Sequence, residues 1–389
     1  MFDKIFSSKK NKISSFSSGK NSEETLTRME CNALRGLAII GIFLHNYCHW
    51  LRPVVKENEY QYFQRNVDGL YKVLQGSWNE LFFFHILSFF GHYGVPVFLF
   101  LSAYGLTMKY EKRAIVTPTN NQYTERMLPL FSFVKYHWLK LFRMMIVGFV
   151  AFTMVDAITI GQHHYKVMDI IGQMGLFNNL LTHPDDIIWP GPYWFFGLMI
   201  QLYIVYRLLL YRRHWAWNMT LIVLCFAIQI ACDPESDALN RWRYNFVGGM
   251  LPFGAGLLYA RHVRPWSTAT NLVAFILSVF AIVLMSFSYL TWYFVPLAVC
   301  IASITFVKLL SRLEAIIDCK NLSLMNILSW VGSISAALFV CHPITRKIFI
   351  PISKEGDYWT GLLLYIIASF CLAWLFKELM KKIPSPKLK

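Results

Sequence analysis

The sequence has few charged residues for its length. Of its 389 residues, 15% are Asp, Glu, Lys or Arg, whereas a soluble domain carries about 25%. Hydrophobic residues reach 56%, and the mean hydropathy is +0.42. This shortage of charge excludes an ordinary soluble enzyme. It also argues against a disordered or nucleic-acid-binding chain, despite the net charge of +15. We therefore expect an integral membrane protein that has no nucleic-acid partner.

The sequence also lacks the residue spacings of a disulfide framework or a metal site. It has eight cysteines and no CxxC pair. Those inside apolar runs act as small hydrophobic groups: Cys48, Cys225, Cys300, Cys341 and Cys371. No HExxH motif occurs among the 11 histidines, and His45 and His49 form an isolated pair four residues apart. We predict no disulfide framework and no bound metal.

What the sequence has instead is a series of long apolar segments. A helix needs about 20 apolar residues to cross a bilayer, and ten segments reach or approach that length. They are 33–51, 82–108, 141–162, 192–211, 216–232, 245–260, 271–287, 291–308, 327–345 and 358–376. The predicted fold class is all-α: a polytopic integral membrane bundle of about ten transmembrane helices, in contact with the lipid bilayer.

Basic residues indicate how this bundle is oriented. Lys and Arg are concentrated in alternate loops, on the side where the N-terminus lies, which the positive-inside rule assigns to the cytosol. An even number of spans then places both termini in the cytosol. We expect a polar cytosolic tail over 1–32 that is not a signal peptide, a membrane domain over 33–376 and a basic cytosolic tail over 377–389. Two amphipathic stretches, 129–140 and 166–182, are expected to lie along the interface.

The first two spans contain unusual polar residues. Arg35 and His45 are about 15 Å apart along a helix axis, so Arg35 lies near the cytosolic surface and His45 near mid-membrane. An ionisable residue there is a candidate functional group. A His that packs against a neighbouring helix and an Arg that snorkels are the structural alternatives. In the second span, Pro96 and nearby glycines predict a broken or kinked helix, with Ser102 and Tyr104 as polar groups at that depth.

Further candidates occur elsewhere in the chain. The segment FVKYHWLKLFR, on the predicted cytosolic side, can bind either the phosphates of a nucleotide cofactor or anionic lipid. Its basic or titratable residues are Lys135, His137, Lys140 and Arg143. Asp156 is an acidic residue inside the third span, where a structural ion pair is favoured over orientation of a histidine.

Four short motifs follow one another along the apolar part of the chain. The first contains Leu34, Arg35, Gly36, Ala38 and His45. The second contains Gly94, Val95, Phe98, Leu99, Ser102, Ala103 and Leu106. The third contains Tyr193, Trp194, Phe195 and Tyr203. The fourth contains Leu328, Gly332, Ser335, Phe339, His342 and Pro343. In this order and topology, they resemble the membrane acyltransferase family 3, the AT3 acyltransferases.

The resemblance implies a ten-span enzyme that uses acyl-CoA and acylates mostly sugars. It implies His45 as catalytic base, with Arg35 and Ser102 in the catalytic site. It also implies a site for coenzyme A phosphates at Arg35, Lys135, His137, Lys140 and Arg143. The candidate substrate-binding residues are His92, Tyr104, Trp194 and His342.

The chain departs from the family pattern in three places. Nine residues separate Arg35 from His45, where ten are usual. Either a local 3₁₀ or π adjustment would be needed to turn His45 to the side of the helix that the family pattern expects, or His49 would act in its place. Ala103 replaces the usual glycine. In the basic motif, His137 and Lys140 stand at arginine positions, and Lys binds phosphate as a point charge only.

The sequence therefore predicts a membrane-bound O-acetyltransferase of the cell (inner) membrane. Acetyl-CoA would be the acyl donor, and the acceptor would be a hydroxyl of a cell-surface saccharide or its lipid-linked precursor. Three alternatives remain: a succinyltransferase, a transporter or translocase of a sugar or lipid-linked sugar, and a family member that only binds or scaffolds. The oligomeric state is not predicted.

Overall fold

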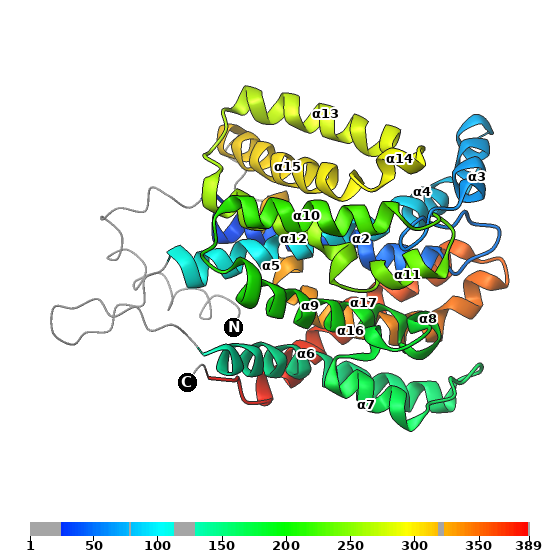
Figure 1. The fold of residues 1–389 in the computed structure, drawn as a ribbon. Helices are drawn as coiled ribbons and strands as arrows, with labels where there is room; N and C mark the ends of the chain where they lie inside the picture. The colour runs from blue at the N-terminus through cyan, green and yellow to red at the C-terminus, as the bar shows by residue number, and fades with distance from the viewer. Residues whose placement is uncertain (1–24, 78, 113–128, 318–322, 388–389) are drawn as a thin grey trace, which may run out of the picture.

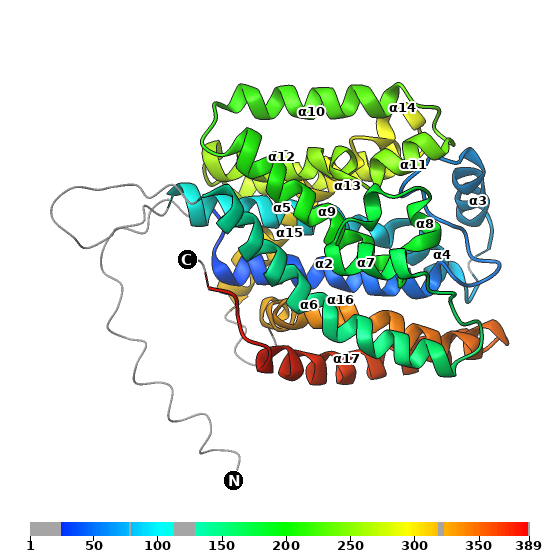
Figure 2. The same ribbon diagram turned by 60° about the horizontal axis from the view of Figure 1, so that its bottom comes forward.

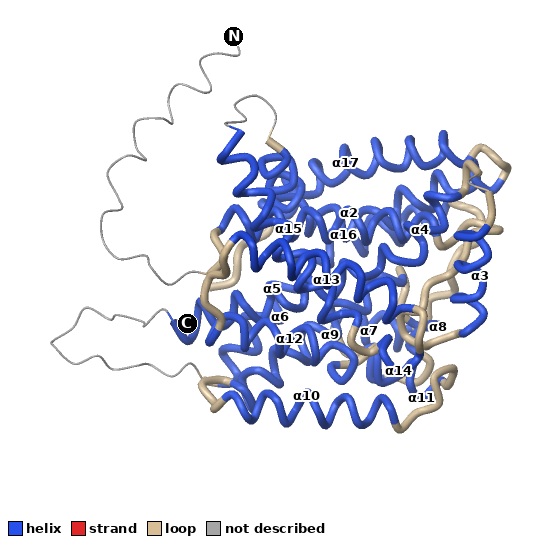
Figure 3. Tube along the Cα trace, turned by 90° about the horizontal axis from the view of Figure 1, so that it is seen from above, coloured by secondary structure: helices blue, strands red, loops and turns tan. Residues whose placement is uncertain are grey.

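The long apolar segments fold into helices, because a helix satisfies its backbone hydrogen bonds within one segment. The computed structural model describes residues 25–77, 79–112, 129–317 and 323–387. Within these residues every regular element is a helix, and strand is absent (Figure 3). The helices that form the predicted spans are α2 Arg28–Cys48, α4 Phe82–Phe90, α5 Gly94–Thr107, α6 Leu130–Ile158, α9 Trp194–Val205, α10 Trp215–Ile230, α12 Phe246–His262, α13 Thr268–Ser286, α15 Val295–Ile317, α16 Leu324–Lys354 and α17 Tyr358–Lys382.

Short helices connect them. They are α3 Gln64–Gln75, α7 Val167–Gly175, α8 Pro184–Ile187, α11 Asp237–Arg243 and α14 Tyr289–Trp292. Figures 1 and 2 show the long helices running side by side, with α3, α8, α11 and α14 gathered at one end of the bundle, on the right in both views. We call this the capped end. α2 runs from the opposite end towards it.

Seven helical stretches of the described chain are long and apolar enough to cross a membrane. They are Phe82–Lys112, Leu130–Ile158, Gly191–Leu210, Thr268–Ser286, Val295–Ile317, Leu324–Lys354 and Tyr358–Lys382. The other three predicted segments are also helical: α2 carries charged residues in its first turns, and α10 and α12 have 16 and 17 residues. The all-helical membrane bundle is thus confirmed. The ten crossings and the cytosolic termini remain predictions.

The outer helices expose apolar side chains, as a lipid solvent requires. On α13, Leu277 and Phe280 are each 62% exposed. α2 differs because it packs against α16, α4, α5 and α15 in the interior. Its N-terminus is fixed by a capping box in which Thr27 and Glu30 hydrogen-bond each other's backbone N–H groups.

Close helix contacts set the position of α2. A Cβ atom on Gly332 of α16 would collide with the carbonyl of Asn32, and one on Gly36 would collide with the carbonyl of Leu328. Side chains at these two positions would push α2 and α16 apart. Further along, a Cβ on Gly91 would lie 2.6 Å from the Cβ of His45. The glycines therefore allow two neighbouring segments to approach both halves of α2.

Several local expectations can be compared with the helices. The predicted break in the second span is present: the 3₁₀ turn η2 Gly91–Tyr93 separates α4 from α5, and Pro96 lies in the first turn of α5. Stretch 129–140 forms the beginning of α6, which is continuous from Leu130, and its place at the interface stays a prediction. Asp156 forms the predicted structural ion pair, with Lys347 of α16.

The structure describes only part of the two predicted terminal tails. Residues 1–24 of the tail predicted over 1–32 lie outside the described residues, and α2 begins at Arg28. At the other end, α17 extends to Lys382. Six cysteines in the described part of the chain are free thiols: Cys48, Cys225, Cys232, Cys300, Cys341 and Cys371.

Candidate active site

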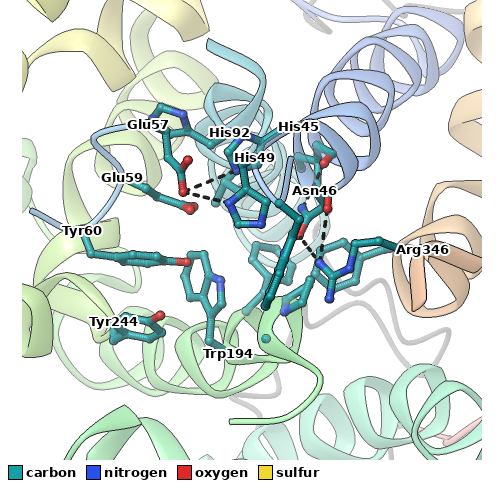
Figure 4. Close-up of a pocket in the computed structure, with 17 residues that line it drawn as sticks. His45, Asn46, His49, Glu57, Glu59, Tyr60, His92, Trp194, Tyr244 and Arg346 are labelled. Atoms are coloured by element: carbon teal, nitrogen blue, oxygen red, sulfur yellow. Dashed lines mark hydrogen bonds and ion pairs between the residues drawn. The ribbon is translucent and has the colours of Figure 1, made fainter. Parts of the chain in front are cut away.

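A cavity of about 130 Å³ lies beside the C-terminal half of α2. We call it the histidine cavity, because His45, His49 and His92 line it (Figure 4). His45 and His49 are four residues apart on α2 and its C-cap, so their rings project from one face, with ring centroids 4.8 Å apart. His92 comes from η2, and its ring centroid is 5.5 Å from that of His45.

A carboxylate from the loop after α2 joins the histidines. Glu57 Oε1 is 3.2 Å from His49 Nδ1 and 3.8 Å from His45 Nε2. Burial opposes ionisation of Glu57, but the neighbouring imidazole of His49, which also hydrogen-bonds the carboxylate, outweighs burial and lowers the pKa of this carboxyl. We therefore take Glu57 to be ionised at neutral pH.

The tautomer of His45 follows from its other contact. His45 Nδ1 is 2.7 Å from the carbonyl oxygen of Ser88 in α4. A carbonyl only accepts hydrogen bonds, so Nδ1 carries the proton and Nε2 of the neutral ring keeps a free lone pair. His45 is only 3% exposed, and this hydrogen bond holds its ring in place. It is therefore oriented with a proton-accepting atom towards Glu57.

The loop that carries Glu57 is anchored on both sides. Ser88 Oγ donates to the carbonyl of Val55 at 2.6 Å, and the Asn66 side chain donates to the carbonyl of Glu57 at 2.8 Å. Two residues later, the guanidinium of Arg243 donates to the carbonyl of Glu59 at 2.9 Å. Glu57 therefore projects from a fixed backbone.

A second carboxyl group and several aromatic rings complete the wall of the histidine cavity. Burial raises the pKa of Glu59 to about 8, and the charge of Glu57 adds to that effect. Tyr60 stacks on Tyr244 with ring centroids 4.0 Å apart, and Trp194 meets Tyr60 edge-on at 5.4 Å. This wall offers flat apolar faces beside hydrogen-bonding groups.

One buried cation also lines the histidine cavity. Arg346 of α16 donates to the backbone and side-chain oxygens of Asn46 at 3.3 and 3.4 Å. Its guanidinium also lies 4.9 Å from the centre of the Trp50 ring. Figure 4 shows Arg346 across the cavity from Glu57 and Glu59.

A second cavity, of about 380 Å³, lies beside the N-terminal half of α2. We call it the arginine cavity, because Arg35 lines it together with Lys140 of α6 and Ser102 of α5. Arg35 donates to the side chain of Asn32 at 2.8 Å. Tyr203, from the third sequence motif, lines the same cavity. Two cationic side chains thus face a space large enough for an extended ligand.

Three apolar side chains line both cavities. Ile42, Phe195 and Phe339 come from α2, α9 and α16, and we call them the septum. The rings of Phe195 and Phe339 are 5.4 Å apart at their centroids. The septum is therefore the only group of side chains shared by the two cavities, within the described residues, and it lies between Arg35 and His45 along the bundle.

The other predicted residues do not line either of these two cavities. Tyr104 hydrogen-bonds the backbone of Leu26, and His342 is fully buried with Nδ1 3.1 Å from the carbonyl of Leu338. In the basic motif, Lys135 is exposed and His137 contacts the hydroxyl of Tyr110 at 3.1 Å. Arg143 donates to the carbonyl of Met380 near the end of α17. Of the predicted coenzyme A residues, only Arg35 and Lys140 face the arginine cavity.

Sequence reasoning missed part of the site and left one spacing unexplained. Glu57, Glu59 and Tyr60 lie in an irregular loop, where no periodicity marks them. Arg346 lies four residues after His342 and just beyond the predicted segment 327–345. α2 is a continuous α-helix from Arg28 to Cys48, without the 3₁₀ or π adjustment considered for the short Arg–His spacing. His49 lies beside His45 on the wall of the same cavity.

Comparison with known proteins gives one match. Residues 30–378 match the family model described as an acyltransferase domain. This range contains both cavities and all four sequence motifs. No match is found among curated proteins or among solved structures.

Proposed function

The chain belongs to the membrane acyltransferase family 3, whose model covers residues 30–378, and from this premise we propose how it works. It transfers an acetyl group from acetyl-CoA to a hydroxyl of a cell-surface saccharide or of its lipid-linked precursor. The donor enters the arginine cavity from the cytosol, and the acceptor enters the histidine cavity from the other side of the cell (inner) membrane. The observation that carries this proposal is the pair of cavities meeting at the septum.

The donor is held by cations at the end where α2 begins. Arg35 and Lys140 face the arginine cavity and provide charge for the phosphates of coenzyme A. The apolar walls and the septum would enclose the extended thiol arm, which brings the thioester towards His45. Arg143 is bound to the carbonyl of Met380 and Lys135 is exposed, so we assign these two residues no direct role in the cavity.

The transfer step needs a base for the acceptor hydroxyl. His45 Nε2 accepts its proton as the hydroxyl oxygen attacks the thioester carbonyl, while Nδ1–H stays bonded to Ser88. Glu57 stabilises the imidazolium that forms. The tetrahedral intermediate then expels the coenzyme A thiolate, which takes the proton from His45. Arg346, on the histidine cavity, supplies positive charge for the oxyanion, and Ser102 is a hydroxyl donor on the donor side.

The acceptor wall supports a saccharide. Trp194, Tyr60 and Tyr244 present ring faces and edges, which suit the apolar faces of sugar rings, and Glu57 and Glu59 offer oxygens for sugar hydroxyls. His92 lines the same cavity.

The test is acetyl transfer by the full-length protein purified in detergent. Replacing His45 with Ala should lower the rate about 10²–10⁴-fold, the usual contribution of a positioned acid–base group, while acetyl-CoA still raises the thermal midpoint. His164→Ala, at an exposed position, should leave the rate unchanged. Full activity in His45→Ala would contradict the assignment, and failure of acetyl-CoA to stabilise the wild-type protein would favour a translocase.

A further inference from the structure

His45, His49 and Glu57 form a group of potential metal ligands. One nitrogen of each ring and one carboxylate oxygen all lie within 4.8 Å of one another. Tetrahedral zinc with bonds of about 2.0–2.2 Å holds its ligand atoms about 3.3 Å apart. The separations of 3.2 and 3.8 Å from Glu57 Oε1 are close to that value. Small rotations of the two rings would complete the three-ligand arrangement.

The surroundings of the group match those of a histidine metal site. A metal-bound imidazole usually donates its other ring N–H to a carbonyl or carboxylate, which fixes the tautomer. His45 already does so through Nδ1–H to Ser88. Glu57 is held by an anchored backbone, so the carboxylate does not have to be ordered when an ion arrives.

Access to the group comes from the histidine cavity. The side chains of His49 and Glu57 are 24% and 14% exposed, whereas that of His45 is 4% exposed. An ion can therefore reach the first two ligands from the cavity and then bind His45 Nε2.

The donor set selects the kind of ion. Two imidazole nitrogens and one carboxylate oxygen are typical zinc ligands, whereas Mg²⁺ prefers oxygen ligands alone. We propose that His45, His49 and Glu57 bind one zinc ion, which inhibits acyl transfer. When His49 binds the ion through Nδ1, its ring proton is carried by Nε2, so the imidazole stays neutral and keeps one N–H.

Inhibition follows from the lone pair that zinc uses. A bound ion occupies His45 Nε2, so this atom can no longer accept the proton of the acceptor hydroxyl. This consequence rests on the proposed function, whereas the binding itself does not.

The binding test uses full-length protein in detergent, first stripped with a chelator. Titration with ZnCl₂ should give one ion per chain, and Co²⁺ in its place should give the visible absorption of tetrahedral nitrogen and oxygen ligation. His49→Gln and Glu57→Gln should each weaken zinc binding at least about tenfold, in line with the loss of one ligand. His164→Gln should bind as the wild type does, and MgCl₂ should not bind.

Two results would overturn the site. One is the absence of stoichiometric zinc binding by the wild type. The other is zinc binding as tight as that of the wild type in both Glu57→Gln and His49→Gln, provided that their thermal melting shows a folded protein. Using two variants from different segments, a helix end and a loop, keeps the test valid if one of them fails to fold.

The inhibition test compares activity with occupancy. Zinc should lower acetyl transfer in proportion to the fraction of protein that holds the ion, and a chelator should restore it. Zinc that binds without lowering the rate, or that is required for it, would overturn the inhibitory role. If the protein shows no acyl transfer with any acceptor, either stripped or loaded with zinc, the proposed function fails, while the binding result still decides the site.

Discussion

His45 acquires its chemistry from contacts that come from two other segments. Ser88 in α4 fixes the ring through Nδ1, and Glu57 in the loop after α2 faces Nε2. The same loop brings Glu59 to the cavity wall, where burial raises the pKa of its carboxyl to about 8. At neutral pH the wall therefore holds one ionised and one protonated carboxyl group, which differ in whether they can donate a hydrogen bond.

Glu59 should impose an upper pH limit on activity. Because its pKa in the folded protein is raised to about 8, the neutral form is present below that pH and is lost above it. Ionisation places a second negative charge beside Glu57, so kcat/KM for the acceptor should fall about twofold at pH 8 and about tenfold at pH 9. Rates measured from pH 6 to 10 should show this decline in the wild type. In Glu59→Gln this decline in rate should disappear. If the decline is unchanged in that variant, another titrating group causes it.

At the scale of elements, α2 is central because both cavities lie along it. It carries Arg35 towards one and His45 towards the other, and α16 packs along its length. The contact is close because Gly36 and Gly332 face each other's backbones without side chains. Small residues that allow this approach are common where membrane helices pack. The distance between the two helices therefore depends on two positions that carry no chemistry.

Replacing Gly332 with Ala should destabilise the bundle. The new Cβ would collide with the carbonyl of Asn32, a backbone atom that cannot rotate away, and overpacking of this kind costs about 1–3 kcal/mol. The thermal midpoint in detergent should fall. Gly105→Ala in α5 is the matched control, because nothing lies within 4 Å of its Cβ position and alanine is a better helix former. Equal midpoints for the two variants would show that α2 and α16 can separate without cost.

At the scale of the whole molecule, the bundle divides its interior into two compartments. The arginine cavity and the histidine cavity lie along opposite halves of α2 and share only the septum in the described chain. The septum side chains come from three helices that are far apart in the sequence. In the proposed reaction, the acyl group must lie at this point, so the septum limits the length of the acyl chain.

Replacing Phe339 with Ala should broaden the choice of acyl donor. Removing one septum ring joins the two cavities, and space for each methylene is worth about 10–200-fold in selectivity. The ratio of butyryl-CoA to acetyl-CoA turnover should rise at least about tenfold. Phe280→Ala, on the exposed face of α13, should leave the ratio unchanged. The same ratio in both variants would mean that acyl length is selected elsewhere.

The sequence alone determined that the chain is a helical membrane protein and which family it belongs to. Long apolar runs form helices regardless of their neighbours, since in lipid each segment must satisfy its own backbone. The ordered motifs contain Arg35, Ser102 and Trp194, which line the two cavities, and their catalytic and binding roles remain predictions. Only the tertiary structure decided that Glu57 reaches His45, that Arg143 binds the end of α17, and that a septum separates two cavities. These features depend on an irregular loop and on contacts between distant helices, which leave no periodic pattern in the sequence.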